Sequence, residues 1–261
     1  MSTADSRRPR NVALAFMAHP DDAEILCGGT LIRLRDLGWE VHIASASPGD
    51  CGSATLPPDE IARIRRAEGR QAAESIGARY HCLEERDLQI IYDKASNRKA
   101  IDLFRQIAPA LVFTHPRRDY MLDHEQAHLL ARSACFGYAI PNASALPLVA
   151  GSKVPHLYYV DPLEGLDPYS GEPTPVTTLV DITGVMERKA KMLSCHASQR
   201  DWLRAHHGMD QYVIAMRGFA GQRGSEIGVD YAEAFRQHLG HAYPQDCLLS
   251  AELGELARAA G

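Results

Sequence analysis

The sequence predicts an α/β fold built on a mostly parallel sheet. Short apolar runs with the length of strands alternate with longer segments of helical periodicity from residue 12 onward. The first run, Val12 to Met17, carries no charge, which is typical of a strand buried on both faces. Regular strand–helix alternation favours right-handed βαβ units, in which the strands run parallel. The 261 residues contain no internal repeat and no clear linker, so we expect a single domain.

The first half of the chain supplies most of the predicted sheet. After the opening strand, leucines and isoleucines repeat with helical spacing from Ile25 to Leu37, and Gly38 ends that helix. No G-x-G-x-x-G sequence follows the first strand, so we expect no dinucleotide site. The other elements expected here are a strand over 39–46, a turn-rich loop over 47–53, a helix over 57–76, a strand over 79–83, a helix over 94–108 and a strand over 110–114.

The second half is less regular. A helix that contains His124 runs to about Tyr138, and the low-charge segment 139–155 is a loop that shapes the rim of a pocket. Strands are expected over 156–161 and 176–182, with a Pro/Gly-rich loop between them, and the second is the last clear strand. The next helix carries Lys189 and His196, and the glycines over 218–228 predict a turn.

Composition excludes several classes of protein. The formal net charge of −5 argues against nucleic acid as the main partner, because phosphate binding needs a basic face. No run of 18 apolar residues exists, so we expect no membrane span. Six scattered cysteines without a C-x-x-C pair, and no export signal, predict reduced thiols and a cytoplasmic location. The polar residues 1–10 are expected to be flexible.

Polar residues directly after the first strand carry the chemistry. Residues 18–22 read Ala-His-Pro-Asp-Asp, at the carboxyl end of a core strand, which is where open α/β sheets bind ligands. His19 and Asp22 lie one helical turn apart and can converge on one metal ion. Asp21, between them, points elsewhere and can face a water molecule. The alternative is that Pro20 and the two aspartates only cap a helix.

His124, which follows another predicted core strand, is the candidate third ligand. Two imidazoles and one carboxylate with an open fourth position describe a catalytic zinc site rather than a structural one. Such a metal lowers the pKa of its water and polarises a carbonyl, and Asp21 is placed to take the proton. The same donor set also admits Fe²⁺. Taken alone, His124 would be interpreted as a surface histidine on a helix.

These motifs resemble those of the LmbE-like/PIG-L family of zinc-dependent N-acetylglucosaminyl deacetylases. The sequence Ala-His-Pro-Asp-Asp-Ala-Glu over 18–24 is similar to the metal-binding signature of that family. The supporting similarities are the loop over 47–53, the R-x-x-E helix at Arg65 to Glu68, the segment from Asp119 to His124 against the family's D-Y-H-P-D-H, Lys189 with His196 to Gln199, and the element from Tyr231 to Phe235.

The resemblance implies a Rossmann-like three-layer αβα fold, with one LmbE-like deacetylase domain over residues 1–261. It also implies attack of metal-activated water on an N-acetyl group of an amino-sugar-containing small molecule. The residues that it assigns are His19, Asp22 and His124 to the metal, Asp21 to general-base catalysis, and Arg65, Asp119 and Tyr120 to substrate binding.

Met121 departs from the family's pattern. The family carries a histidine at this position that helps to stabilise the oxyanion and is oriented by the following aspartate. Methionine can neither donate a charged hydrogen bond nor transfer a proton. Asp123 therefore loses its usual partner, and we expect it to cap the helix. The candidates for a replacement are His196, His115, His128 and Tyr120, of which we favour His196 as the catalytic residue because its motif is retained.

Three functions are compatible with these observations. The first is removal of an N-acetyl group from an amino-sugar compound, and the second is cleavage of the amide in a thiol–sugar conjugate. The third is a sugar-binding protein that retains the metal without turnover, which the methionine at position 121 motivates. The sequence leaves a homo-oligomer open.

Overall fold

The computed structural model describes residues 11–199 and 212–260, so the expected flexibility of residues 1–10 lies outside the described part. The strands are β1 (Val12–Met17), β2 (Glu40–Ser45), β3 (Arg79–Cys82), β4 (Leu111–Thr114), β5 (His156–Val160), β6 (Thr178–Asp181), β7 (Ala232–Gln237) and β8 (Ala257–Ala259). They form one sheet in the order β3-β2-β1-β4-β5-β7-β6-β8. Neighbours from β3 to β5 pair in parallel, whereas β7, β6 and β8 pair antiparallel, which confirms a mostly parallel sheet.

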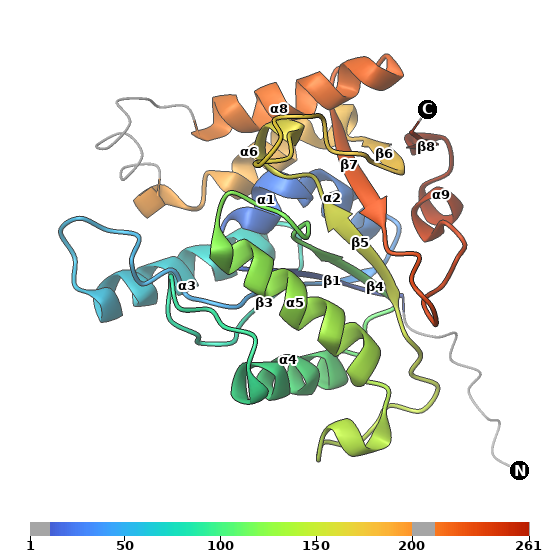
Figure 1. The fold of residues 1–261 in the computed structure, drawn as a ribbon. Coiled ribbons are helices and arrows are strands. Elements are labelled where there is room, and N and C mark those ends of the chain that lie inside the picture. The colour runs from blue at the N-terminus through green and yellow to red at the C-terminus, as the bar shows by residue number, and fades with distance from the viewer. Residues whose placement is uncertain (1–10, 200–211, 261) are drawn as a thin grey trace, which may run out of the picture.

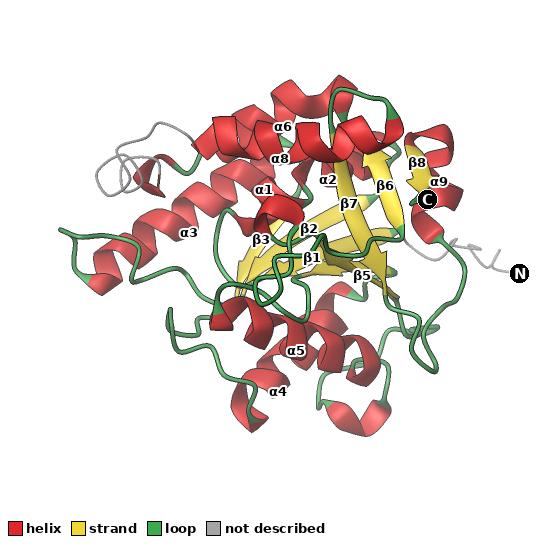
Figure 2. Cartoon of the chain, turned by 45° about the horizontal axis from the view of Figure 1, so that its top comes forward, coloured by secondary structure: helices red, strands yellow, loops and turns green. Residues whose placement is uncertain are grey.

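Helices cover both faces of this sheet, as Figures 1 and 2 show. The helices are α1 (Asp22–Leu26), α2 (Gly28–Asp36), α3 (Pro58–Ser75), α4 (Lys94–Ile107), α5 (Leu122–Gly137), α6 (Met186–Leu193), α8 (Tyr212–Ile227) and α9 (Leu248–Leu253). Helices α4 and α5 lie on one face, and α2, α3, α6 and α8 lie on the other. The three-layer α/β architecture is therefore confirmed. In the part of the chain that the structure describes, none of the helices has the length and apolar character to cross a bilayer.

Strand β1 lies between β2 and β4 and joins the two cores. Because side chains alternate along a strand, one set packs toward each helical layer. Ala13, Ala15 and Met17 belong to the core beneath α2 and α6. Val12, Leu14 and Phe16 belong to the core beneath α4 and α5. Burial of all six positions explains the unbroken apolar run, and it fixes the end of β1 where the polar residues begin.

Three local predictions were wrong. The single helix expected over 25–37 is divided at Cys27 into α1 and α2. The turn expected over 218–228 is mostly helical, since α8 continues to Ile227. Glycine lowers helix propensity by about 1 kcal/mol relative to alanine, but packing of α8 against β7 overrides this preference. Strands β7 and β8 follow the strand that the sequence predicted to be the last.

Candidate metal centre and active site

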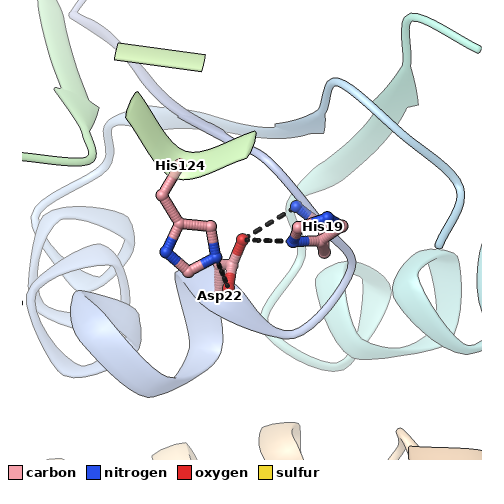
Figure 3. Close-up of side chains that lie close together, drawn as sticks. All are labelled: His19, Asp22 and His124. Atoms are coloured by element: carbon pink, nitrogen blue, oxygen red, sulfur yellow. Dashed lines mark hydrogen bonds and ion pairs between the residues drawn. The ribbon is translucent and has the colours of Figure 1, made fainter. Parts of the chain in front are cut away.

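The three predicted metal ligands lie together at the carboxyl ends of β1 and β4. Asp22 lies between His19 and His124 (Figure 3), and one ligand atom from each residue lies within 4.8 Å of the others. His19 Nδ1 is 3.6 Å from Asp22 Oδ2, and His124 Nε2 is 3.6 Å from Asp22 Oδ1. Tetrahedral ligands with bonds of about 2.1 Å stand about 3.4 Å apart, so this donor set fits a zinc-like ion.

The turn between β1 and α1 brings these groups together. Asp21 has a φ of 108°, a left-handed conformation that side chains other than glycine rarely adopt. The backbone N–H of His19 donates to Asp22 Oδ2 over 2.8 Å and holds the turn closed. Such a conformation costs about 1–3 kcal/mol and is typical of functional sites. The strain therefore lies at the residue that separates the two ligands of the motif.

Carboxylates orient both histidine rings from behind. His124 Nδ1 is 2.9 Å from Asp119 Oδ1, and His19 Nε2 is 3.2 Å from Asp123 Oδ2 and 3.1 Å from Asp87 Oδ1. The contacts with Asp119 and Asp123 are hydrogen bonds, whereas Asp87 Oδ1 lies beside the His19 ring without a hydrogen-bond partner among the described residues. The outer nitrogens are therefore occupied and the inner ones are left for the metal, as carboxylate–histidine–metal units require.

The structure corrects the expected role of Asp123. This side chain makes no helix cap, and it is buried beside His19 while it accepts a hydrogen bond of 2.7 Å from the backbone N–H of Leu88. Asp123 has therefore not lost its function with the missing family histidine. It holds the ring of His19, a candidate metal ligand, instead.

His115 supports the site from the opposite side. Its ring is fully buried and stacks on His124, with centroids 3.9 Å apart. Its Nε2 accepts from the backbone N–H of Ala18 over 3.0 Å and lies 3.1 Å from Asp22 Oδ2. Burial, together with the neighbouring charge of His124, lowers the pKa of His115. The ring therefore packs against His124 and Asp22 and does not line the cavity described next.

A cavity of about 510 Å³ opens over the ligands. Four aspartates line it, Asp21, Asp22, Asp87 and Asp119, together with His19, His124, Arg65 and Gln199. Apolar residues from the end of α1, the loop after β5 and helix α8 line it as well, namely Ile25, Leu26, Leu163, Ala215, Met216 and Phe219. A small molecule bound here would meet both the metal ligands and an apolar surface.

Asp21 and Asp22 differ in their electrostatic surroundings. Burial, which Arg65 opposes, raises the pKa of Asp21. Burial also acts to raise the pKa of Asp22, but the charge of His124, together with hydrogen bonding from His19, holds it well below its usual range. Adjacent carboxylates with separated pKa values are a pattern of acid–base sites. Asp22 suits a permanently ionised ligand, and Asp21 suits a group that exchanges a proton.

Tyr212 was missed by the sequence analysis. Its hydroxyl donates to Asp21 Oδ2 over 2.5 Å, and its ring lines the cavity from the first turn of α8. It lies 191 positions from Asp21 in the chain, without a motif around it. Nothing in the local spacing connects the two residues, so only the fold reveals this contact.

The predicted substrate-binding residues all line the cavity, with different exposure. Tyr120 is 64% exposed at the rim, and the centroid of its ring lies 5.3 Å from that of His124. Asp119 is buried and directed at His124. Arg65 is buried, and its guanidinium donates to the carbonyl oxygens of Gly49 and Pro20, 3.2 and 2.8 Å away, and lies 3.3 Å from Asp21. Its Nη donors are thus already engaged by the protein.

His196, the favoured replacement for the missing histidine, does not line this cavity. Its ring is fully buried, and its Nε2 lies 3.4 Å from Glu24 Oε1. Met121 does line the cavity, at the N-terminal boundary of α5. His128, another candidate, lines a different cavity. Of the four candidates only Tyr120 reaches the active-site cavity.

The chain is similar to several known proteins. Residues 14–135 match the family model PIG-L, described as GlcNAc-PI de-N-acetylase. The chain is 27% identical over 252 residues to 4-oxalmesaconate hydratase of Pseudomonas putida, covering 90% of this chain and 92% of the relative. It is 28% identical over 198 residues to diacetylchitobiose deacetylase of Thermococcus kodakarensis, covering 71% and 69%. The solved N,N'-diacetylchitobiose deacetylase from Pyrococcus horikoshii superposes with a TM-score of 0.74 at 28% identity, covering 90% of this chain and 87% of that one.

Proposed function

The chain belongs to the LmbE-like/PIG-L family, and on that premise we propose that it is a metal-dependent hydrolase that removes an N-acetyl group from an amino-sugar-containing small molecule. The observation that carries the proposal is the convergence of His19, Asp22 and His124 at metal-ligand spacing, with Asp21 beside them on one cavity. A zinc or ferrous ion on these ligands would polarise the amide carbonyl and make a water molecule more acidic.

The chain's own groups supply the proton transfers. Asp21 takes a proton from the attacking water and returns it to the nitrogen of the leaving amine, which its raised pKa favours. Tyr212 and Arg65 hold that carboxylate in place through their contacts with Oδ2. The role that we propose for His196 is indirect. Its positive charge lowers the pKa of the buried Asp21 and so opposes the effect of burial. Tyr120, at the rim, is the proposed contact for the hydroxyl groups of the sugar.

The charge of the cavity favours a neutral amide over an anionic substrate. Among the described residues, four aspartates line it, against a single arginine, Arg65, whose Nη groups are already hydrogen-bonded to the protein. The hydratase relative is named for a carboxylate substrate. A carboxylate anion in this cavity would meet an excess of negative charge, and the described lining offers no free guanidinium to bind it. Hydration of such an anion is the second candidate function because of the similarity to the hydratase, and the charge of the cavity disfavours it.

One set of assays separates these functions. Protein loaded with zinc or with ferrous iron is incubated with N-acetylglucosamine, N,N'-diacetylchitobiose, an N-acylated thiol–sugar conjugate and 4-oxalmesaconate, and acetate, free amine and hydration are measured. Release of acetate from the amino sugars, and its loss on chelation, supports the deacetylase. Cleavage of the conjugate alone supports the amidase, and hydration alone supports the second candidate. Stoichiometric metal without any turnover supports a sugar-binding protein.

Asp21→Asn is the matched variant for these assays. It should lower kcat by about 10²–10⁴-fold, because general-base catalysis contributes that much, while the metal content remains near one per chain. Full activity in this variant contradicts the assignment of the base. Met121→His tests the departure from the family pattern, and an increase in kcat would mean that the missing histidine limits the reaction.

A further inference from the structure

A second cavity, of about 630 Å³, lies outside the active site. It is bounded by the loop after β4, one side of α5 and the ends of β5 and β7. It shares no lining residue with the active-site cavity. The volume lies within the range of small-molecule sites.

Arginines dominate the charge of this second cavity. Arg117, Arg118, Arg132 and Arg236 line it, together with two acids, Asp161 and Asp167. Both acids are already paired with an arginine. Asp161 accepts a hydrogen bond of 2.6 Å from Arg223, and Asp167 lies 3.3 Å from Arg118. Among the described residues the other three arginines have no carboxylate partner. In a chain of net charge −5, these guanidinium groups form a local excess of positive charge.

Two buried polar atoms in the same cavity also lack a partner within the described part of the chain. They are His128 Nε2 and Thr174 Oγ1. The His128 side chain is 1% exposed, and its Nδ1 lies 3.0 Å from the carbonyl oxygen of His115. A carbonyl can only accept, so Nδ1 carries the proton and Nε2 of the neutral ring presents a lone pair. Burial, and further the charge of Arg132, lowers the pKa of His128 to about 4, so the ring is neutral near pH 7.

We propose that this second cavity binds a phosphate group together with a hydroxyl that can donate a hydrogen bond. The hydroxyl is either the P–OH of free phosphate or a hydroxyl group of a phosphate ester. Arg132 and Arg236 bind the negatively charged oxygens, and His128 Nε2 accepts the hydrogen bond from the hydroxyl. Guanidinium groups suit phosphate oxygens because they donate in a planar fork. A bare nitrogen acceptor repels a fully deprotonated anion, but it accepts from a P–OH or from a sugar hydroxyl. Thr174 Oγ1 can serve as donor or acceptor beside it. The proposal is independent of the function of the metal centre.

Calorimetric titration near pH 7 at constant chloride concentration tests the proposal. Inorganic phosphate should bind with a millimolar or lower Kd, and sulfate, which has no proton to donate at this pH, should bind at least about tenfold more weakly. Glucose 6-phosphate is the second probe. Tighter binding than that of phosphate assigns the cavity to an ester, and equal binding assigns it to the free ion. Absence of phosphate binding up to 20 mM, or equal binding of sulfate, overturns the proposal.

Variants connect the binding to this cavity. Arg132→Gln and Arg236→Gln should each weaken phosphate binding by about tenfold, without loss of metal. Arg70→Gln is the matched control, since it removes an equally exposed arginine from α3, away from the cavity. Because both cavity arginines are exposed, their replacement should not prevent folding, which circular dichroism checks. Phosphate binding that is equal in all three variants and the unmodified protein overturns the assignment.

Discussion

Asp21 and Asp22 are neighbours in sequence, yet the fold gives them opposite chemistry. The side chain of Asp22 turns between two histidines, and that of Asp21 turns to Tyr212 and Arg65. Burial acts to raise both pKa values, but the histidines outweigh it at Asp22, whereas Arg65 and Tyr212 do not outweigh it at Asp21. One strained residue thus divides a single motif into the proposed ligand and the proposed base.

The contact of Tyr212 with Asp21 predicts a pH effect. Asp21 must be ionised to accept a proton, so activity is present above its raised pKa and is lost as the pH falls through it. The hydrogen bond from Tyr212 favours the ionised form, so Tyr212→Phe should move the acidic limb of the kcat/KM profile to higher pH. Tyr120→Phe is the control, because that tyrosine lines the same cavity and does not hydrogen-bond Asp21 in the described structure. An unchanged limb in Tyr212→Phe would contradict this role.

The hydrogen bond behind His19 predicts a change in metal affinity. Asp123→Asn keeps the size of the side chain but removes the charge that orients the ring. Loss of such an outer partner weakens metal binding by about 10–100-fold, which competition with a zinc chelator measures. Asp59→Asn, which removes an exposed carboxylate of α3, should leave the affinity unchanged. Equal affinities in both variants would mean that Asp123 is only a structural residue.

At the scale of elements, two helices position the site through close contacts with the sheet. Helix α2 reaches β7 through Glu233, which accepts from the backbone N–H groups of Gly29 and Thr30 over 2.8 and 2.7 Å. Lys189 of α6 completes the contact at 2.7 Å from the same carboxylate. This buried charge pair joins α2, α6 and β7 directly behind α1. The packing explains why glycine stands inside a helix at this point.

Two glycine substitutions should therefore have opposite effects. A Cβ at Gly29 would lie 2.7 Å from Ile182, so Gly29→Ala should lower the free energy of unfolding by about 1–3 kcal/mol. A Cβ at Gly218, in the helical backbone of α8, would meet no atom within 4 Å. Gly218→Ala should therefore raise that free energy by about 0.5–1 kcal/mol. Urea unfolding measures both changes, and a stabilising Gly29→Ala would contradict the close packing of α2.

For the whole molecule, the sequence analysis predicted correctly those strands whose two faces are both buried by helices. Strand β1 is such an element, and its end carries the metal motif in the predicted position. Strand β7 was missed because it contains Glu233 and Arg236 and has no apolar run to mark it. The pairing of His19 with Asp123, and of Tyr212 with Asp21, depends on ring orientation and on distant segments. Neither contact can be predicted from the spacing of residues along the chain.

The metal centre should also contribute to the stability of the whole domain. It joins the end of β1 to the start of α5, so an ion would cross-link segments about 100 residues apart, as the 104-residue separation of His19 and Asp123 illustrates. Without a cation, the carboxylates of Asp22, Asp87, Asp119 and Asp123 gather around two histidines, all of them buried. At a hundredfold excess over its Kd, zinc should therefore add about 2.7 kcal/mol, which corresponds to a rise in Tm of roughly 5–10 °C.

Calorimetry with and without a chelator measures this rise. His124→Ala should abolish it, because the variant loses one ligand while Asp22 and His19 remain. His156→Ala is the control, since that histidine lies on β5 and interacts with Asp246 away from the centre, so its zinc response should equal that of the unmodified chain. An equal rise in Tm for His124→Ala would mean that zinc stabilises the chain from another site. The three converging ligands would then not be its high-affinity metal centre.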